Sequence, residues 1–263
     1  MKKPGILKAV LITGLFLVLT VSAVMASQDL SGEEILDELK ENDTLTGSGT
    51  ATIKLTTENK QGKQRFNTLK LFRKEDENNE KQLLEYLEPA DVKGTKFLAI
   101  TDENDENKMW LYLPALGRER SISGHQTRDK FMDTDFTYDE LGGGQSYSED
   151  YWAERLDDQD FEGYPCYLLK LIPEDEDSEY SMLKMWVWQE EMLPLKIQFY
   201  NTDGQLSKEL ISREIEENED GEYMPYLITM SDKLAGTRSI IEILETSSED
   251  IDDEYFSLRY LRR

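Results

Sequence analysis

The residue types that most often carry out catalysis gather in one short stretch of the sequence. His125 is the only histidine of the chain, and Ser121, Ser123 and Asp129 lie near it. A nucleophile relay needs a hydroxyl, a base and an orienting carboxylate that meet in space, and neighbouring positions in one polar turn do not supply that geometry. We therefore expect that the protein is not an enzyme and has no catalytic residue, with an exported hydrolase as a minor alternative.

Carboxylates and thiols give no stronger chemical signal. Asp133 and Asp135 could act as paired carboxylates, but an aspartate in this context is more often a helix cap. One histidine and one cysteine, Cys166, cannot make a zinc cluster, and residues 102–107 lack the glycine and glutamate of an EF-hand loop. The sequence thus predicts no metal, no cofactor and, with a lone cysteine, no internal disulfide.

The same stretch is basic, although the whole chain has a formal net charge of −25. Its cations are Arg118, Arg120, Arg128 and Lys130, against the acids Glu119 and Asp129. Arginine suits carboxylate and phosphate groups, so this segment could bind a lipid head group or an acidic partner. The alternative is a set of surface ion pairs, each worth ~0–1 kcal/mol. The acidity elsewhere argues against nucleic acid and against adsorption to anionic membranes.

The elements that must position these residues begin after a targeting segment. Lysines precede an apolar run at residues 9–21, and small residues follow it up to Ala26. The run is shorter than the ~20 residues that span a membrane, which favours a cleaved secretory signal at residues 1–26 over a membrane anchor. Residues 27–263 contain no low-complexity linker, so we expect one domain there.

Residues 31–41 are predicted to form a short helix. Ser31 and Glu34 make a capping box, and Ile35, Leu36 and Leu39 fall on one side. The stripe is narrow, so the helix must pack on something to persist. It is either an ordinary core helix or a lid over an opening.

From residue 49 onward the apolar pattern has a period of two, which is typical of β-strands. The expected strands cover residues 51–58, 65–74, 81–88, 94–101, 109–113, 166–172, 181–188, 195–201, 206–215, 226–231 and 238–244. Acidic runs between them, including residues 157–160 and 174–179, are interpreted as solvated turns. The expected fold is mainly β: an antiparallel sheet curled into an unclosed β-barrel, with the N-terminal helix and a short helix as lid. Its interior could be filled or hollow.

Several motifs resemble the LolA-like family of outer-membrane lipoprotein-sorting proteins. The most specific is FMDTDFTYDEL at residues 131–141, which follows an aromatic-x-Tyr-x-Pro-Ala strand end and an arginine-rich turn. Residues 184–204 and 255–263 resemble the same family. One departure is Trp188, where the family usually has aspartate after its Trp-apolar pair. The resemblance implies a periplasmic carrier whose hollow barrel holds acyl chains.

The resemblance also implies the site. The expected lining of the lipid cavity is apolar: Leu36, Leu39, Leu69, Leu71, Trp110, Tyr112, Phe131, Met132, Phe136, Leu183, Met185, Val187, Leu195, Ile197 and Phe199. The expected head-group or partner site is Arg73, Arg118, Arg120 and Arg128. The implied partners are a lipoprotein or lipid cargo, an inner-membrane transporter as donor and an outer-membrane acceptor, and a monomer is expected. The competing hypothesis is a non-lipid interaction module with a filled barrel.

Overall fold

The computed structural model describes residues 30–41, 48–76, 79–102, 107–143, 147–218 and 221–263, so the proposed signal segment lies outside the described residues. The strands are β1 (Gly49–Glu58), β2 (Gln64–Asp76), β3 (Asn79–Glu88), β4 (Lys96–Thr101), β5 (Asn107–Leu113), β6 (Arg118–Ile122), β7 (Tyr151–Phe161), β8 (Tyr164–Pro173), β9 (Tyr180–Trp188), β10 (Leu193–Asn201), β11 (Leu206–Glu217), β12 (Tyr223–Asp232) and β13 (Thr237–Ser248). The helices are α1 (Gly32–Glu41), α2 (Tyr138–Gly142), α3 (Tyr147–Asp150) and α4 (Leu258–Leu261), with 3-10 helices η1 (Pro114–Leu116), η2 (Gly124–Arg128) and η3 (Asp253–Phe256). Among the described residues, no helix has the length and apolar character needed to cross a membrane.

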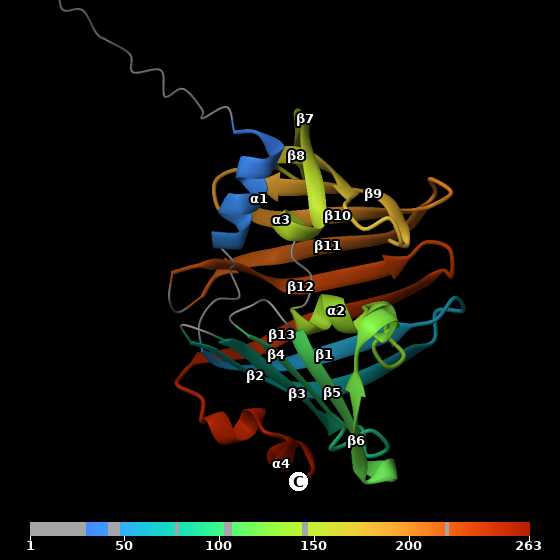
Figure 1. The fold of residues 1–263 in the computed structure, drawn as a ribbon, viewed down its shortest axis with the longest axis vertical. Coiled ribbons are helices and arrows are strands. Elements are labelled where there is room, and N and C mark those ends of the chain that lie inside the picture. The colour runs from blue at the N-terminus through green and yellow to red at the C-terminus, as the bar shows by residue number, and fades with distance from the viewer. Residues whose placement is uncertain (1–29, 42–47, 77–78, 103–106, 144–146, 219–220) are drawn as a thin grey trace, which may run out of the picture.

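All the strands belong to one antiparallel sheet, in the order β6-β5-β4-β3-β2-β1-β13-β12-β11-β10-β9-β8-β7. Neighbours in the sheet are mostly neighbours in sequence, and β1 joins the two halves by pairing with β13. The end strands β6 and β7 do not pair with each other, so the sheet is an unclosed barrel. Helices α1, α2 and α3 lie on one side of it (Figure 1). The expected fold class is confirmed.

Two predicted turns are in fact strands. Residues 118–122 form the edge strand β6, and residues 157–160 lie within β7, the other edge strand. Charged residues are tolerated in both because an edge strand keeps one side in water. The β7–β8 pairing also shifts register between Leu156 and Gln159, which interrupts the alternation that sequence reading relies on.

The two faces of the sheet bury different groups of side chains. We call the face that carries α1 and α2 the inner face, and the opposite one the outer face. On the outer face the C-terminal segment covers β3 and β4, where Ile251, Phe256 and Leu261 pack against Leu83 and Leu98. The C-terminal chain therefore covers the outer face at β3 and β4, and the helices α1 and α2 lie on the inner face.

Helix α1 has the predicted capping box. The Ser31 N–H donates to Glu34 Oε2 at 2.8 Å, and the Glu34 N–H donates to Ser31 Oγ at 3.3 Å. The helix lies against the edge strand β7, where Glu33 accepts the Ala153 N–H at 2.8 Å. Helix α1 thus covers part of an edge that would otherwise be free to pair with another strand.

Candidate functional site

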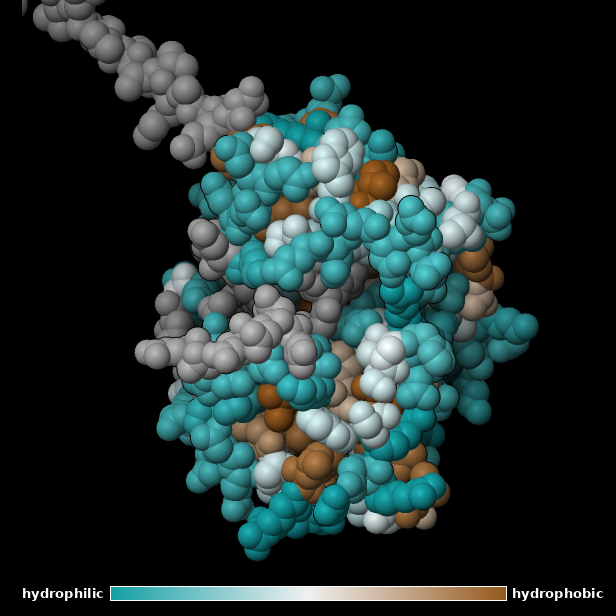
Figure 2. Space-filling view, in the orientation of Figure 1, coloured by the Kyte–Doolittle hydropathy of each residue, from teal (hydrophilic) through white to brown (hydrophobic). Residues whose placement is uncertain are grey.

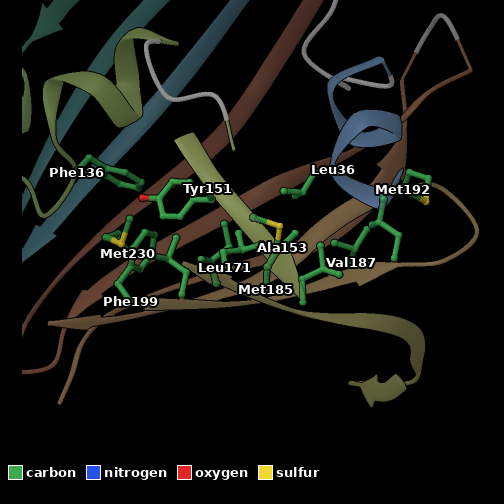
Figure 3. Packing of buried hydrophobic residues seen from close by; sticks show 14 residues of the cluster. Leu36, Phe136, Tyr151, Ala153, Leu171, Met185, Val187, Met192, Phe199 and Met230 are labelled. Carbon is green, nitrogen blue, oxygen red and sulfur yellow. The ribbon is translucent and has the colours of Figure 1, made fainter. Parts of the chain in front are cut away.

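The inner face holds an apolar interior in two parts. The first part lies between α1 and the strands β7–β12, and Figure 3 shows its side chains converging from both sides. Its members include Leu36, Phe136, Leu169, Leu171, Leu183, Met185, Val187, Ile197, Phe199 and Met230. Leu, Met and Phe predominate, and Met in particular adapts its shape to irregular apolar neighbours. An acyl-chain site and a filled core would both use such side chains.

The second part lies over β1–β5 and is centred on Phe131. This side chain is 0% exposed and packs edge-on against Phe97 and Tyr138, with ring centroids 5.3 Å away in each case. Tyr86 stacks on it at 6.3 Å. Such aromatic pairs add ~0.5–1.5 kcal/mol each beyond the area that they bury. Phe131 is therefore well held where it sits.

Phe131 and Phe136 both belong to the segment that connects β6 to α2 across the inner face. We call residues 123–143 the crossing segment. Phe131 enters the second part of the interior and Phe136 enters the first. The Phe131 N–H donates to the Phe136 carbonyl at 2.7 Å, and Thr134 Oγ1 donates to the Phe131 carbonyl at 2.7 Å. Because of this tight turn, the Phe131 and Phe136 rings pack into different halves of the barrel interior.

Asp135 anchors the crossing segment to β13. Its carboxylate is buried and accepts hydrogen bonds from Ser239 Oγ at 2.9 Å and Thr237 Oγ1 at 2.6 Å. Lys130 Nζ donates to the same carboxylate at 3.0 Å and to Asp232 at 2.9 Å. Burial opposes the charge of Lys130, but its hydrogen bonds to both carboxylates outweigh burial and raise its pKa. The anchor is thus a small network of charge-assisted bonds.

Helix α2 holds the other end of the crossing segment. Thr137 is its N-cap in a capping box with Glu140, which corrects the expectation that Asp133 or Asp135 caps a helix. Glu140 also pairs with Lys208 of β11 at 3.3 Å, where both side chains are about one-tenth exposed. A β-carbon at Gly142 would lie 2.6 Å from Met109 Cε, so a larger residue here would require the end of the Met109 side chain to move.

Most of the expected cavity-lining residues do face this interior. In the first part lie Leu36, Leu39, Phe136, Leu183, Met185, Val187, Ile197 and Phe199, and in the second lie Leu69, Leu71, Phe131 and Met132. Trp110 and Tyr112 do not, because they alternate with Met109 and Leu111 and so pack on the outer face under the C-terminal segment. Leu195 also packs elsewhere, beside Cys166 and Trp188, because β10 shifts register against β9 between Pro194 and Lys196.

The four expected head-group arginines are not in one place. Arg128 binds Asp175 and the Asp177 carbonyl, with side-chain distances of 2.5 and 3.1 Å, so it ties down the acidic β8–β9 turn. Arg73 pairs with Glu80 at 3.1 Å. Arg118 and Arg120 are exposed on the inner side of β6, opposite Leu113 and Leu111. Arg128 thus makes an ion pair of the kind that the alternative interpretation expects.

Arg120 is the arginine that touches the interior. Its guanidinium donates to the Tyr138 hydroxyl at 3.2 Å, and Tyr138 is one of the rings around Phe131. Arg118 lies two residues away on the same face of the edge strand. Together they place positive charge at the rim of the second part of the interior.

Some interior residues escaped the sequence reading. Phe97, Met109 and Tyr138 are buried beside Phe131, although the first two lie in strands that were predicted. Strand alternation was the sequence signal that could have identified them. Met109 and Trp110 are neighbours in one strand, so only one of the two can face the interior. The Asp135 anchor had no sequence signal, because its partners Thr237 and Ser239 are about one hundred residues away.

Two surface pockets lie outside the apolar interior. One of about 200 Å³ lies between α2 and the β8–β9 turn and is lined by Arg128, Asp139, Glu140, Asp175 and Tyr180, among others. The other, of about 480 Å³, lies between β1, β2 and the β3–β4 turn. In the described part of the chain, no group of three or more His, Cys, Asp or Glu side chains is placed to hold a metal ion.

Comparisons with known proteins agree with this geometry. Residues 78–263 match the model of a family described as "Uncharacterized protein". No curated protein matches the chain. The structure is similar to that of a candidate outer membrane lipoprotein-sorting protein domain from Vibrio parahaemolyticus, with 28% identity, a TM-score of 0.80, and coverage of 88% of this chain and 98% of the other.

Two further structures share the fold at lower identity. A DUF1329 family protein from Desulfovibrio piger has 22% identity and a TM-score of 0.79, and the match covers 88% of this chain and 97% of that one. A LolA superfamily protein from Nitrosomonas europaea has 20% identity and a TM-score of 0.66, with coverage of 88% and 99%. At these identities the likeness is one of fold.

Proposed function

Because this chain belongs to the family matched by its residues 78–263 and has the LolA-like fold, we propose that it is a carrier that binds acyl chains of lipoproteins or other lipids. One observation carries the proposal. The inner face carries two apolar clusters, and the crossing segment contributes one ring to each of them, Phe136 to the first part and Phe131 to the second, although it is not a strand of the sheet. Because the crossing segment is not a strand of the sheet, it can move out of the apolar interior while the sheet stays intact.

The energetics favour exchange between the segment and a ligand. Each buried CH₂ group of an acyl chain is worth ~0.8 kcal/mol, so a chain that replaces the two phenylalanine rings recovers the apolar contacts that they give up. For the segment to leave, its polar contacts with the strands must break, namely those of Asp135 with β13 and of Glu140 with β11. Return of the segment would then expel the ligand. Loading and release need no covalent chemistry, which fits the expectation that the protein is not an enzyme.

The position of a head group follows from the charges at the rim. Arg118 and Arg120 are exposed on the inner side of β6, and Arg120 bonds to Tyr138 beside Phe131. An acyl chain in the place of Phe131 would bring its polar end toward these guanidinium groups. Arginine pairs with phosphate or carboxylate through two parallel hydrogen bonds, which suits this end of the ligand.

The cellular setting is part of the same proposal. The sequence features of residues 1–26 support export by a cleaved signal peptide, and the likeness to a lipoprotein-sorting domain supports work in the periplasm. A carrier there would receive cargo from an inner-membrane transporter and deliver it to an outer-membrane acceptor as a monomer. Shielding of acyl chains while they cross the aqueous space is the task that the apolar interior fits.

The experiment is displacement of a fluorescent fatty acid from the purified protein, with two matched variants. Met185→Gln places an amide in the interior, and Leu195→Gln places one in the outer cluster beside Trp188. Both side chains are almost fully buried, at 0% and 1% exposed, so each substitution should cost a similar ~1–3 kcal/mol of stability. Only Met185→Gln should weaken binding of the probe.

A packed interaction module remains the second candidate, because the interior side chains Phe131, Met185 and Phe199 are each 0% exposed in this structure. Such a module would bind no probe, or the two glutamine variants would weaken binding equally through loss of stability. Native mass spectrometry of protein purified from its own source, followed by lipid extraction, gives an independent reading. Co-purified lipid would support the carrier, and its absence together with no probe binding would support the module.

A further inference from the structure

Exposed apolar side chains gather at one end of one half of the sheet. The antiparallel strand order places the β1–β2, β3–β4, β5–β6 and β12–β13 turns at the same end. We call residues 59–66, 88–95, 114–117 and 233–236 the turn rim. In Figure 1 the β1–β2 and β12–β13 turns project together on the right, and the tip that carries η1 lies below them.

Printed contacts join these turns into one surface. A β-carbon at Gly236 would lie 3.7 Å from Lys60 Cβ, which places the β12–β13 turn against the β1–β2 turn. Arg65 pairs with Asp91 at 2.7 Å and so links β2 to the β3–β4 turn. A β-carbon at Gly94 would lie 3.4 Å from Pro114 Cγ, which continues the row to the β5–β6 tip.

Three large apolar side chains stand out from this surface. Leu116 and Leu234 are each 60% exposed, and Phe66 is 54% exposed. Leu116 follows exposed Pro114 and Ala115, so the β5–β6 tip is apolar over its whole length. Figure 2 shows brown patches along the right and lower right of the molecule, where these turns lie. Single exposed leucines are common, but three on one row of turns form a shared feature.

The charges of the turn rim differ from those of the rest of the chain. Its acids near the turns are mostly neutralised: Glu58 pairs with Arg238, Asp91 with Arg65, and Asp232 with Lys130. In the part of the chain that the structure describes, no carboxylate pairs with Lys60, Lys63 or Lys93, while Glu88 is the rim carboxylate left unpaired there. The rim therefore keeps a surplus of positive charge.

The surrounding surface limits this basic area. The β8–β9 turn points to the same end of the sheet from its other half, and residues 174–179 are strongly acidic. The sequence is also acidic at residues 102–107 and 217–220, outside the turn rim. Hence the net charge of −25, which argues against adsorption to anionic membranes, is unevenly distributed over the molecule.

We propose that the turn rim docks on a membrane surface that contains anionic phospholipid. Lysines at the rim meet the lipid phosphates, and Leu116, Leu234 and Phe66 enter the head-group region, which is the pattern of an interfacial membrane anchor. The acidic remainder of the molecule is repelled by the same surface, so it turns the rim toward the membrane. This docking is a property separate from acyl-chain binding in the interior.

The experiment is co-sedimentation of the purified protein with vesicles of phosphatidylglycerol and phosphatidylcholine, compared with phosphatidylcholine alone. The protein should sediment with the mixed vesicles and remain in solution with the neutral ones, and added salt should weaken the association. Replacing Lys60, Lys63 and Lys93 by glutamine should reduce binding by about fivefold per lysine, which corresponds to ~1 kcal/mol for each.

The apolar contribution is tested with Leu116→Ser and Leu234→Ser. Both positions are in open turns, so the fold should be unaffected, and binding to the mixed vesicles should fall. Leu244→Ser is the matched control, because Leu244 is 52% exposed on β13 but lies away from the turn rim, and it should bind as the unaltered protein does. Lys70→Gln, in the middle of β2, is the control for charge.

Two results would overturn the proposal. One is absence of sedimentation with phosphatidylglycerol vesicles, which would leave the rim as a surface for a protein partner. The other is an equal loss of binding for Leu244→Ser and Leu116→Ser. Met185→Gln, which tests the interior, should leave vesicle binding unchanged, so the two proposals can fail separately.

Discussion

At the scale of single residues, Asp135 is the side chain that bonds the crossing segment to β13. It is 4% exposed and accepts from two hydroxyls of β13 and from Lys130. A buried carboxylate is costly unless its lone pairs are satisfied, and here hydrogen bonds satisfy both oxygens. The residue therefore makes the segment stable in its place, but it does so through a few bonds that can break together.

The first prediction at this scale is that Asp135→Asn loosens the crossing segment. An amide keeps the shape but loses the charge that Lys130 and the hydroxyls bond to, so the protein should lose about 1–3 kcal/mol of stability. The fluorescent fatty acid should then associate faster, because the segment leaves more often. Asp133→Asn is the control, since Asp133 is exposed in the same turn. Slower association in Asp135→Asn, or equal effects of both substitutions, would contradict the role of the anchor.

At the scale of elements, local patterns were sufficient to predict most of the strands, because side chains that face the interior recur at every second position. Leu183, Met185 and Val187 of β9 illustrate this, since all three face the interior as expected. The patterns failed at edge strands and at bulges. Leu195 has the right spacing from Ile197, but the β9–β10 register shift turns it to the outer face, and no single-strand pattern reports a shift between two strands.

The candidate site was less predictable than the fold for a related reason. Trp110 and Tyr112 are as apolar as Met109 and Leu111, so alternation shows that the two pairs face opposite ways but does not say which pair is inside. The choice depends on what covers each face. Here the C-terminal segment with Phe256 and Leu261 packs on the outer side of these strands, which is a contact between distant parts of the chain.

The prediction at this scale concerns how α1 sits on β7. A β-carbon at Gly32 would lie 2.6 Å from the Ala153 carbonyl oxygen, and backbone atoms cannot move aside cheaply. Gly32→Ala should therefore lift the start of α1 and break the bond from the Ala153 N–H to Glu33, at a cost of about 1–3 kcal/mol. Hydrogen exchange at Ala153 should become faster, and the helix should retain lipid less well if it is a lid.

A control separates this effect from a general loss of helix stability. Asp37→Ala changes an exposed residue on the solvent side of α1 and should leave exchange at Ala153 unchanged. If Gly32→Ala also leaves the amide protected, α1 is not held at that point. If the whole sheet exchanges together, α1 is an ordinary part of the core and the lid interpretation is wrong.

At the scale of the whole molecule, the crossing segment is the part that connects the two halves of the interior. Phe136 packs with residues of β8–β12, whereas Phe131 packs with residues of β2–β5. The edge strands β6 and β7 do not pair with each other, and the crossing segment, which follows β6, packs against both halves of the sheet instead. In a carrier built this way, the crossing segment and the ligand would compete for the same apolar face, so only one of them could occupy it at a time.

The last prediction tests that choice directly with a reversible cross-link. In the double variant Asp135→Cys with Ser239→Cys, the two thiols should form a disulfide, because Ser239 Oγ lies 2.8 Å from the Asp135 backbone nitrogen and 2.9 Å from its carboxylate, which brings the two β-carbons close together. The native Cys166 should not interfere, since burial raises its pKa to about 11 and its thiol is rarely ionised. The oxidised protein should bind no fluorescent fatty acid because its crossing segment is locked in the interior. Reduction should restore binding, while the single variant Ser239→Cys should bind equally in both conditions. Equal binding by the oxidised and reduced double variant would show that lipid enters without displacing Phe131 and Phe136, and the proposed exchange would then be wrong.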